Sequence, residues 1–381
     1  MASKILFNSY NTTSAGTSNI TKFILVSLFK NEAAAEDKKL YFILPDIKIF
    51  KEFKSSAEVK IIKLPVFFGL FNYIFRCFYE VLFLPVISII LGTPTVIIMA
   101  NYSPVILHGK KIVFMRHPYL VENQKTDPFL KGVGFIEFMR RLIFKITLLS
   151  SDLIIVQSSY MKKRLTECFG RISKIAILPN PVSNLMKMEI NIDKKKNKKS
   201  LIVLYVSRFY PHKNHWFLLG LVDRYRDEFR RKKIKFYITV NSSFKDKDSR
   251  IFLNEIDKRG LTGIILNIGE IPNEMLGKYY REARCFFFPS CLETYGNPLV
   301  EAMAFGLPVV APDLSYVHAI CNDSCLYYSA DDVEDAYKKL TSVLYDDDFY
   351  KQISIKGLNR VKKFPSVESW LHQLVSLTRS C

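Results

Sequence analysis

The stretch PSCLETYGNPLVEAMAFGLPVVA, residues 289–311, decides how the rest of this 381-residue chain is interpreted. The apolar run Phe286–Phe288 before it predicts a strand. Asn297 stands where the N-cap of a helix belongs, and Pro298 suits the first helical position. Gly306 suits the end of that helix. The stretch therefore predicts a strand, a loop, a short helix and a second strand.

Two carboxylates mark this stretch. Glu293 lies in the predicted loop, and Glu301 follows in the first turn of the predicted helix. The free N–H groups of the helix start, from Leu299 onward, would form an anion site. The helix start would bind a phosphate group and the two carboxylates would bind hydroxyl groups, so this arrangement suits a phosphorylated ligand that carries hydroxyls. The alternative is that both glutamates are solvated surface charges, and their spacing alone leaves both interpretations open.

Length and composition predict two domains of ordinary size, with neither a zinc site nor disulfides. A chain of 381 residues is long enough for two domains of ordinary size, and 49% hydrophobic content supplies their cores. The seven cysteines are scattered, and none forms a zinc-ligand spacing, so we expect reduced thiols in a cytoplasmic protein. The apolar run at the N-terminus is too short for a signal peptide.

The positive charge is concentrated in the first half of the chain. Residues 1–200 hold 30 Lys and Arg against 14 Asp and Glu, whereas residues 201–381 hold 25 against 22. Nucleic acid and an anionic membrane are the two partners that such basicity favours. We expect no nucleic acid, because the sequence carries none of the zinc-finger, RNP or helix-turn-helix patterns.

Alternating apolar strands and amphipathic helices predict a doubly wound, mostly parallel sheet in each half. The Lys-rich residues 186–200 are the expected linker between an N-terminal domain, 1–185, and a C-terminal domain, 201–365. A terminal helix, 366–381, is expected to pack back on the first domain. In that domain Gly16 follows the first strand in a small-residue loop, and His117 follows another strand, where α/β sheets place ligand contacts.

The most apolar stretch is Pro65–Gly92, whose few polar residues fall on one helical stripe. Arg76, Glu80 and Pro85 argue against a membrane span. Two interpretations remain, a helix buried against a sheet and a helix lying partly in the membrane interface.

Three loops of the second domain are expected at neighbouring strand ends. Arg208 and Lys213 follow the strand Leu201–Val206, and Gly269, Glu270 and Ile271 follow a later strand. The Glu293 loop is the third. Two cations beside a helix start can hold a diphosphate without metal, and no metal-ligand cluster is evident in the sequence.

These motifs resemble the retaining, GT-B-fold glycosyltransferases of the group 1 family. The resemblance rests on five motifs of the C-terminal half: Ser207-Arg208, Lys213-Asn214, Gly269-Glu270, Glu293-x7-Glu301 and Gly306-x-Pro308. It also rests, more loosely, on Arg116-His117-Pro118, Pro179-Asn180-Pro181 and the Asn8–Gly16 loop, where Ala15 stands in place of a first glycine. The resemblance implies two Rossmann-like domains that face a cleft.

The resemblance also implies a role for each candidate residue. Arg208 and Lys213 would hold the nucleotide diphosphate, with Gly16 close to the phosphates. Glu301 would bind the ribose, and Glu293 the donor sugar. His117 would lie near the sugar's 6-hydroxyl and the acceptor. Gly269, Glu270, Ile271, Asn297 and Leu299 would complete the donor site.

The sequence therefore predicts a metal-independent, retaining hexosyltransferase that needs no cofactor. It would move a sugar from a nucleotide sugar to a glycan or lipid-linked glycan in bacterial O-antigen, lipopolysaccharide or capsule synthesis. We expect it in the cytoplasm, on the inner face of the plasma membrane. The alternatives are a nucleotide-sugar epimerase on the same fold and a non-catalytic, basic, membrane-associated binding protein.

Overall fold

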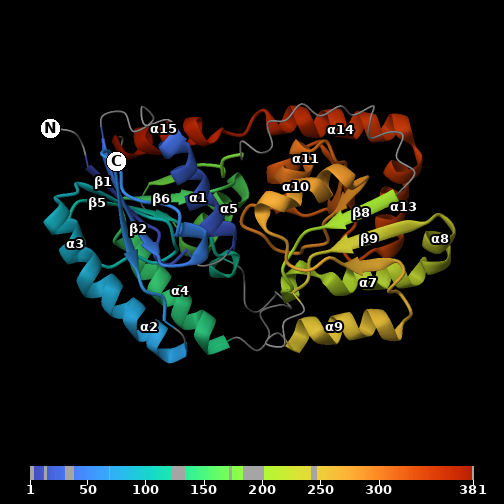
Figure 1. Ribbon diagram of the computed structural model, residues 1–381, viewed down its shortest axis with the longest axis horizontal. Helices are drawn as coiled ribbons and strands as arrows, with labels where there is room; N and C mark the ends of the chain where they lie inside the picture. The colour runs from blue at the N-terminus through green and yellow to red at the C-terminus, as the bar shows by residue number, and fades with distance from the viewer. Residues whose placement is uncertain are drawn as a thin grey trace. The chain divides into compact units, whose positions relative to one another are not determined.

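The computed structural model describes residues 4–12, 15–30, 38–67, 69–121, 134–170, 174–182, 201–241 and 247–379. The chain divides into two compact units. The N-terminal unit comprises Met1–Pro181 and Pro365–Cys381, and the C-terminal unit comprises Val182–Phe364. The expected linker, 186–200, lies outside the described residues. Each unit is a parallel sheet with helices on both faces (Figure 1).

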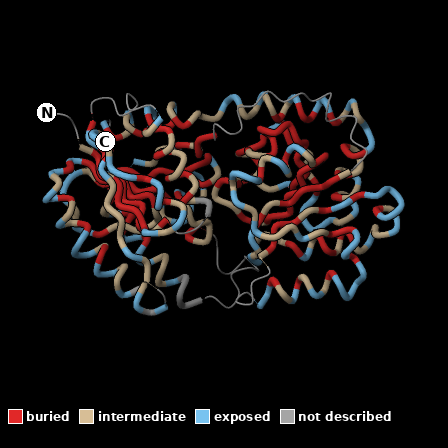
Figure 2. Tube along the Cα trace, viewed as in Figure 1, coloured by how far each residue is buried: buried red, intermediate tan, exposed pale blue. Residues whose placement is uncertain are grey.

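The sheet of the N-terminal unit has seven parallel strands in the order β3-β2-β1-β4-β5-β6-β7. They are β1 (Lys4–Asn8), β2 (Lys39–Pro45), β3 (Val59–Leu64), β4 (Thr95–Ile98), β5 (Lys110–Phe114), β6 (Leu153–Val156) and β7 (Ile175–Ile177). The central strands are continuous apolar runs because both of their faces are covered (Figure 2). The strand order reverses between β1 and β4, which is where such sheets bind ligands.

Helices cover both faces of this sheet. One face packs against α1 (Ala15–Lys30) and the terminal helix α15 (Val367–Arg379), whose Trp370 is fully buried and stacks on Phe114. The other face packs against α2 (Gly69–Phe78), the π-turn η3 (Tyr79–Phe83), α3 (Leu84–Leu91), α4 (Gly134–Leu149) and α5 (Ser159–Phe169). Short 3-10 turns, η2 (Lys48–Phe50) and η4 (Pro118–Leu120), complete the unit.

The helical segment α2–η3–α3 differs from an ordinary surface helix, because the side that it exposes is apolar. Its side toward the sheet carries Tyr79, Leu84 and Ser88, which are buried, and Glu80, which accepts hydrogen bonds from Asn8 and Asn11. The side turned away from the sheet is apolar and exposed, through Phe71, Ile74, Phe78, Val81, Leu82, Phe83, Val86, Ile89 and Ile90.

The expectation of a helix over Pro65–Gly92 is confirmed, with a start at Gly69. The π-turn ends at Phe83, two residues before Pro85, whose ring in a regular helix would clash with the carbonyl of Val81. The helix packs against the sheet along one side, as one interpretation has it, and it exposes the other side, so it is buried only in part.

The C-terminal unit is a six-stranded parallel sheet in the order β10-β9-β8-β11-β12-β13. Its strands are β8 (Leu201–Tyr205), β9 (Ile234–Ile238), β10 (Ile265–Asn267), β11 (Cys285–Phe287), β12 (Val309–Pro312) and β13 (Cys325–Tyr328). The order reverses between β8 and β11, so these two strands adjoin although their first residues, Leu201 and Cys285, lie 84 positions apart in the chain. That reversal brings the two loops of interest together.

The helices of this unit connect successive strands. They are the 3-10 turn η7 (Pro211–Lys213), α7 (His215–Arg224), α8 (Arg226–Arg231), α9 (Lys247–Lys258), α10 (Asn273–Glu282), α11 (Asn297–Ala304), α12 (Ser315–Cys321), α13 (Val333–Tyr345) and α14 (Asp347–Val361). The predicted fold class, two doubly wound α/β domains, is confirmed.

Candidate active site

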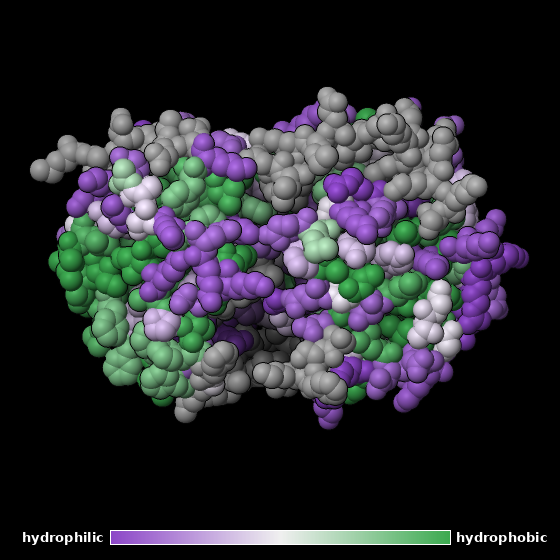
Figure 3. All heavy atoms as spheres, viewed as in Figure 1, coloured by the Kyte–Doolittle hydropathy of each residue, from purple (hydrophilic) through white to green (hydrophobic). Residues whose placement is uncertain are grey.

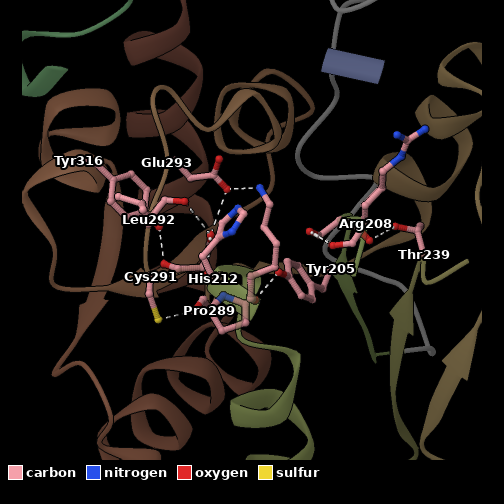
Figure 4. Close-up of polar contacts among 12 residues, drawn as sticks. Tyr205, Arg208, His212, Thr239, Pro289, Cys291, Leu292, Glu293 and Tyr316 are labelled. Carbon is pink, nitrogen blue, oxygen red and sulfur yellow. Dashed lines mark hydrogen bonds and ion pairs between the residues drawn. The ribbon is translucent and has the colours of Figure 1, made fainter. Parts of the chain in front are cut away.

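The candidate site lies at the carboxyl edge of the C-terminal sheet, where β8 and β11 run side by side with Cys285 opposite Val203. The loop after β8 carries Arg208 and Lys213, and the loop after β11 carries Glu293. Figure 4 shows the side chains of both loops at this edge. Ligands of doubly wound sheets bind at such a reversal.

Lys213 and Glu293 form an ion pair between the two loops. Their side chains are only 16% and 13% exposed, so the pair is largely withdrawn from water. The Ser290 hydroxyl lies 3.0 Å from the same Glu293 oxygen, Oε1. Removing one partner of so buried a pair should destabilise the protein, because the remaining charge would stay desolvated.

Backbone contacts hold the two loops in register. The Cys291 N–H donates to the His212 carbonyl at 2.7 Å. In addition, the Tyr205 hydroxyl donates to the Lys213 carbonyl and the Tyr316 hydroxyl donates to the Ser290 carbonyl, both at 2.5 Å (Figure 4). These two supporting hydrogen bonds cannot be predicted from the sequence, because a tyrosine in an apolar strand or helix carries no local sign of its distant partner.

Arg208 binds a different carboxylate. Its Nε and Nη2 atoms donate to Glu270 Oε1 at 2.9 and 2.5 Å, and Asn241 Nδ2 donates to Glu270 Oε2 at 3.1 Å. Gly269 precedes this carboxylate with φ +73°, a conformation that favours glycine, and Ile271 follows it. Figure 4 shows Arg208 directed away from Glu293, so the two predicted cations do not share one partner.

Glu301 lies in the second turn of α11 instead of the first. The helix begins at Asn297, and its N-cap is Gly296 in the left-handed conformation at φ +76°, so the prediction of Asn297 as the cap is wrong by one residue. The local reason is that the chain must turn sharply after Tyr295, and only glycine adopts that conformation without strain. The Leu299 N–H, expected to be free, donates to the Gly296 carbonyl at 2.9 Å.

The Glu301 side chain is half-buried in the C-terminal unit. Its Oε2 atom accepts a hydrogen bond from the Tyr280 hydroxyl at 2.8 Å. Burial raises the pKa of Glu301, and the hydrogen bond from Tyr280 opposes that rise. Tyr280 itself is fully buried on α10 and stacks on Phe305. Tyr280 therefore orients Glu301, a role that the sequence analysis did not assign.

The two remaining candidates, Gly16 and His117, belong to the N-terminal unit. Gly16 is the second residue of α1, so it lies in the start of a helix and the expectation of a loop there is wrong. His117 is half-buried and extended, three residues beyond the end of β5 at Phe114 and directly before η4. Both therefore lie at the carboxyl edge of the N-terminal sheet.

Among the described residues, no three side chains of His, Cys, Asp or Glu gather closely enough to hold a metal ion.

Comparison with known proteins agrees with this geometry. Residues 187–360 match the model of the family described as glycosyl transferases group 1, a range that includes Arg208, Lys213, Glu293 and Glu301. The match covers most of the C-terminal unit, Val182–Phe364. The O-antigen chain mannosyltransferase B of Escherichia coli is 27% identical over 161 residues, which are 42% of this chain and 41% of that relative. The aligned part thus spans less than half of that relative's length.

Solved structures share the fold over the whole length of this chain. A sucrose-phosphate synthase of Thermosynechococcus elongatus superposes with a TM-score of 0.77 at 17% identity, over 99% of this chain and 98% of that one. WaaG, a glycosyltransferase involved in lipopolysaccharide biosynthesis, superposes with a TM-score of 0.74 at 13% identity, over 99% and 100%. The predicted GT-B fold is confirmed.

Proposed function

We propose that this protein is a retaining, metal-independent glycosyltransferase of bacterial surface-polysaccharide synthesis. It would take a sugar from a nucleotide-diphospho-sugar and attach it to a glycan or lipid-linked glycan. The observation that carries the proposal is the pairing of each predicted cation with a predicted carboxylate at one sheet edge: Lys213 with Glu293, and Arg208 with Glu270. The family match and the O-antigen and lipopolysaccharide relatives support it.

These ion pairs suggest how the donor is bound. The diphosphate of the donor would replace the carboxylates as the partner of Lys213 and Arg208, because charge-assisted bonds to phosphate are as strong as those to carboxylate. The released Glu293 would then accept hydrogen bonds from sugar hydroxyls. Glu301, oriented by Tyr280, would accept those of the ribose, next to the start of α11 at Asn297. Gly269, Glu270 and Ile271 would line the same donor site.

The proposed chemistry needs no base from the protein. The bond between the anomeric carbon and the diphosphate oxygen breaks while the acceptor hydroxyl attacks from the same face. The departing phosphate oxygen takes the acceptor's proton, and Lys213 and Arg208 stabilise the charge that develops on the diphosphate. From the N-terminal unit, Gly16 would approach the phosphates, and His117 would contact the sugar's 6-hydroxyl and the acceptor.

The exposed apolar side of α2–η3–α3 supports a proposal for the acceptor and the location. The segment Ile74–Leu91 is long and apolar enough to cross a membrane, with 17% of it buried. It packs on the sheet along one side, however, so lipid cannot surround it. Ile90 is 75% exposed while Ser88 is fully buried. We therefore propose that the exposed side lies in the interface of the inner leaflet (Figure 3 shows the apolar side chains gathered over α2 and α3).

The helix α4 adds to this membrane surface. It exposes Phe138, Leu142, Ile143, Ile146 and Leu149, and it carries the cations Arg140, Arg141 and Lys145. Exposed apolar side chains beside cations suit the interface of an anionic bilayer. We therefore expect a membrane-borne acceptor, such as a polyprenyl-diphosphate glycan, to be met at the inner face of the plasma membrane.

Co-sedimentation with vesicles tests the membrane surface. We expect the protein to bind phosphatidylglycerol-containing vesicles, less so at high salt. Replacing Val81 and Ile90 by Ser should weaken binding at least tenfold, because two exposed apolar side chains lose about 2 kcal/mol or more of transfer free energy. Met275→Ser, an exposed apolar residue of the C-terminal unit, is the control. Unchanged vesicle binding by the V81S/I90S variant would refute the proposal. So would a parent protein that binds no vesicles but forms dimers that V81S/I90S dissociates, because the apolar side would then be a contact between two copies of the chain.

A donor screen tests the enzymatic function. We expect one UDP- or GDP-sugar to raise the melting temperature of the C-terminal unit by mass action. Its labelled sugar should then pass into the lipid extract of bacterial membranes in the presence of EDTA. Loss of transfer in EDTA, restored by Mg²⁺ or Mn²⁺, would refute metal independence, and the anomeric configuration of the product would test retention.

A further inference from the structure

The carboxyl edge of the N-terminal sheet holds a buried cation that the proposed donor chemistry does not use. Arg116 follows β5, and its Nη1 atom donates to Asn180 Oδ1 at 3.3 Å. Its Nε and Nη2 atoms are buried and have no hydrogen-bond partner in the described part of the chain. No carboxylate there forms an ion pair with it, and burial lowers its pKa to about 10. Such a charge is costly to keep.

The free atoms of Arg116 form one edge of its guanidinium. Nε–H and Nη2–H point in parallel, which is the fork that accepts two oxygens of one phosphate or carboxylate. Packing fixes the group, because the guanidinium lies 4.9 Å above the ring of Phe114, which stacks on Trp370. The backbone N–H of Arg116 donates to Asn101 Oδ1 at 2.6 Å. The fork is therefore held in place before any ligand binds.

A second buried polar side chain lies at the same edge. Phe114 of β5 is paired with Ile155 of β6, so Arg116 and Gln157 leave adjacent strands at matching positions. Gln157 is 1% exposed, and neither its oxygen nor its nitrogen has a partner among the described residues. Buried amides are ordinarily hydrogen-bonded, so two adjacent unsatisfied side chains indicate a missing polar ligand.

We infer that Arg116, with Gln157 and Asn180 beside it, is an oxyanion site that binds a phosphate or carboxylate group of the acceptor. The inference rests on the proposed function, since it assigns to the acceptor an anion that the N-terminal unit recognises. Arg116 binds two oxygens through its fork, and the Gln157 amide donates to a further oxygen. The site explains why this unit keeps an unpaired buried charge at a cost in stability.

Isothermal titration with inorganic pyrophosphate tests this site. The protein used is the full chain carrying Arg208→Ala and Lys213→Met, with Glu293→Gln to remove the unpaired carboxylate, so that the donor site is disabled. We expect residual pyrophosphate binding that Arg116→Gln weakens at least tenfold. Lys60→Gln removes one exposed charge from the same unit and should leave the binding unchanged. Sodium acetate in a parallel titration distinguishes a carboxylate from a phosphate ligand.

Stability separates a binding role from a structural one. If Arg116 serves a ligand, R116Q should leave the melting temperature of the ligand-free protein unchanged or raise it. Arg116→Lys, which keeps the charge without the fork, should also weaken binding. Absence of binding of both anions, or equal binding by R116Q, would overturn the inference. The inference would also be overturned if R116Q had a lower melting temperature and R116K bound the anion as tightly as the parent protein does. Nucleotide binding by the wild-type protein tests the proposed function separately.

Discussion

Glu80 offers a direct test of how the helical segment α2–η3–α3 is held against the N-terminal sheet. It lies in the π-turn, and its Oε1 atom accepts hydrogen bonds from Asn11 at 2.5 Å and Asn8 at 3.4 Å. Its other oxygen is buried without a partner among the described residues. Burial raises the pKa of Glu80 to about 8, against the opposing effects of Asn8 and Arg76. The folded protein therefore keeps this carboxyl protonated at neutral pH.

The sign of the resulting pH dependence follows from proton linkage. Between the ordinary pKa of 4.5 and the raised value of about 8, the folded state holds a proton that the unfolded state releases. The free energy of unfolding thus falls as pH rises through this window, by at most about 1.4 kcal/mol per pH unit. The whole effect is about 3 to 5 kcal/mol. Glu80→Gln, which mimics the protonated carboxyl, should abolish it.

The measurement is denaturant unfolding of the N-terminal unit at several pH values. The chain has two tryptophans, and Trp370 lies in the core of this unit. In a Trp216→Phe background, fluorescence therefore reports on this unit alone. We expect E80Q and its parent to be equally stable near pH 5, and E80Q to be more stable by a few kcal/mol above pH 8. Parallel stability curves across that range would refute the reasoning.

Two further predictions concern the C-terminal unit. Tyr280→Phe removes the only described donor to Glu301 Oε2, so it should lower the free energy of unfolding by about 1 to 3 kcal/mol and also lower the affinity for the nucleotide. Denaturant unfolding of Y280F measures the first effect and titration calorimetry the second. An unchanged nucleotide affinity would contradict the role proposed for Glu301. Gly296→Ala places a Cβ at φ +76° and 3.0 Å from Leu299 Cδ1, and should cost about 1 to 2 kcal/mol in denaturant unfolding, whereas Gly263→Ala, with open space around it, serves as control.

The fold could be predicted from the sequence because buried parallel strands are continuous apolar runs. Strands such as Val309–Pro312 and Leu153–Val156 carry that signal locally. The helix over Pro65–Gly92 was harder, because periodicity shows that a helix has two sides and does not show which side meets the sheet. Glu80 shows why: its carboxylate faces the sheet because it accepts hydrogen bonds from Asn8 and Asn11, which lie about seventy residues away in the chain.

The same limit applies to the candidate site. The E-x7-E spacing and the cations at strand ends are local patterns, and they predicted Arg208, Lys213, Glu293 and Glu301. The supports of these residues are not local: Tyr280 reaches Glu301 from another helix, and Tyr205 and Tyr316 bind loop carbonyls. The pairing of Arg208 with Glu270 is likewise set by the order of the strands, which the sequence of either loop does not contain.

The central claim is that Lys213 and Glu293 act on a nucleotide-sugar donor, and sugar transfer by the pair variant tests it most directly. Lys213→Met alone leaves a buried carboxylate unpaired and should destabilise the unit, so the measurement uses Lys213→Met with Glu293→Gln, which removes both charges. Lys258→Met, at an exposed lysine of the same unit, is the control.

At equal folded fraction, the account predicts that K213M/E293Q transfers labelled sugar at least about a thousandfold more slowly than the wild-type protein, while K258M matches it. Wild-type turnover in K213M/E293Q would contradict the account.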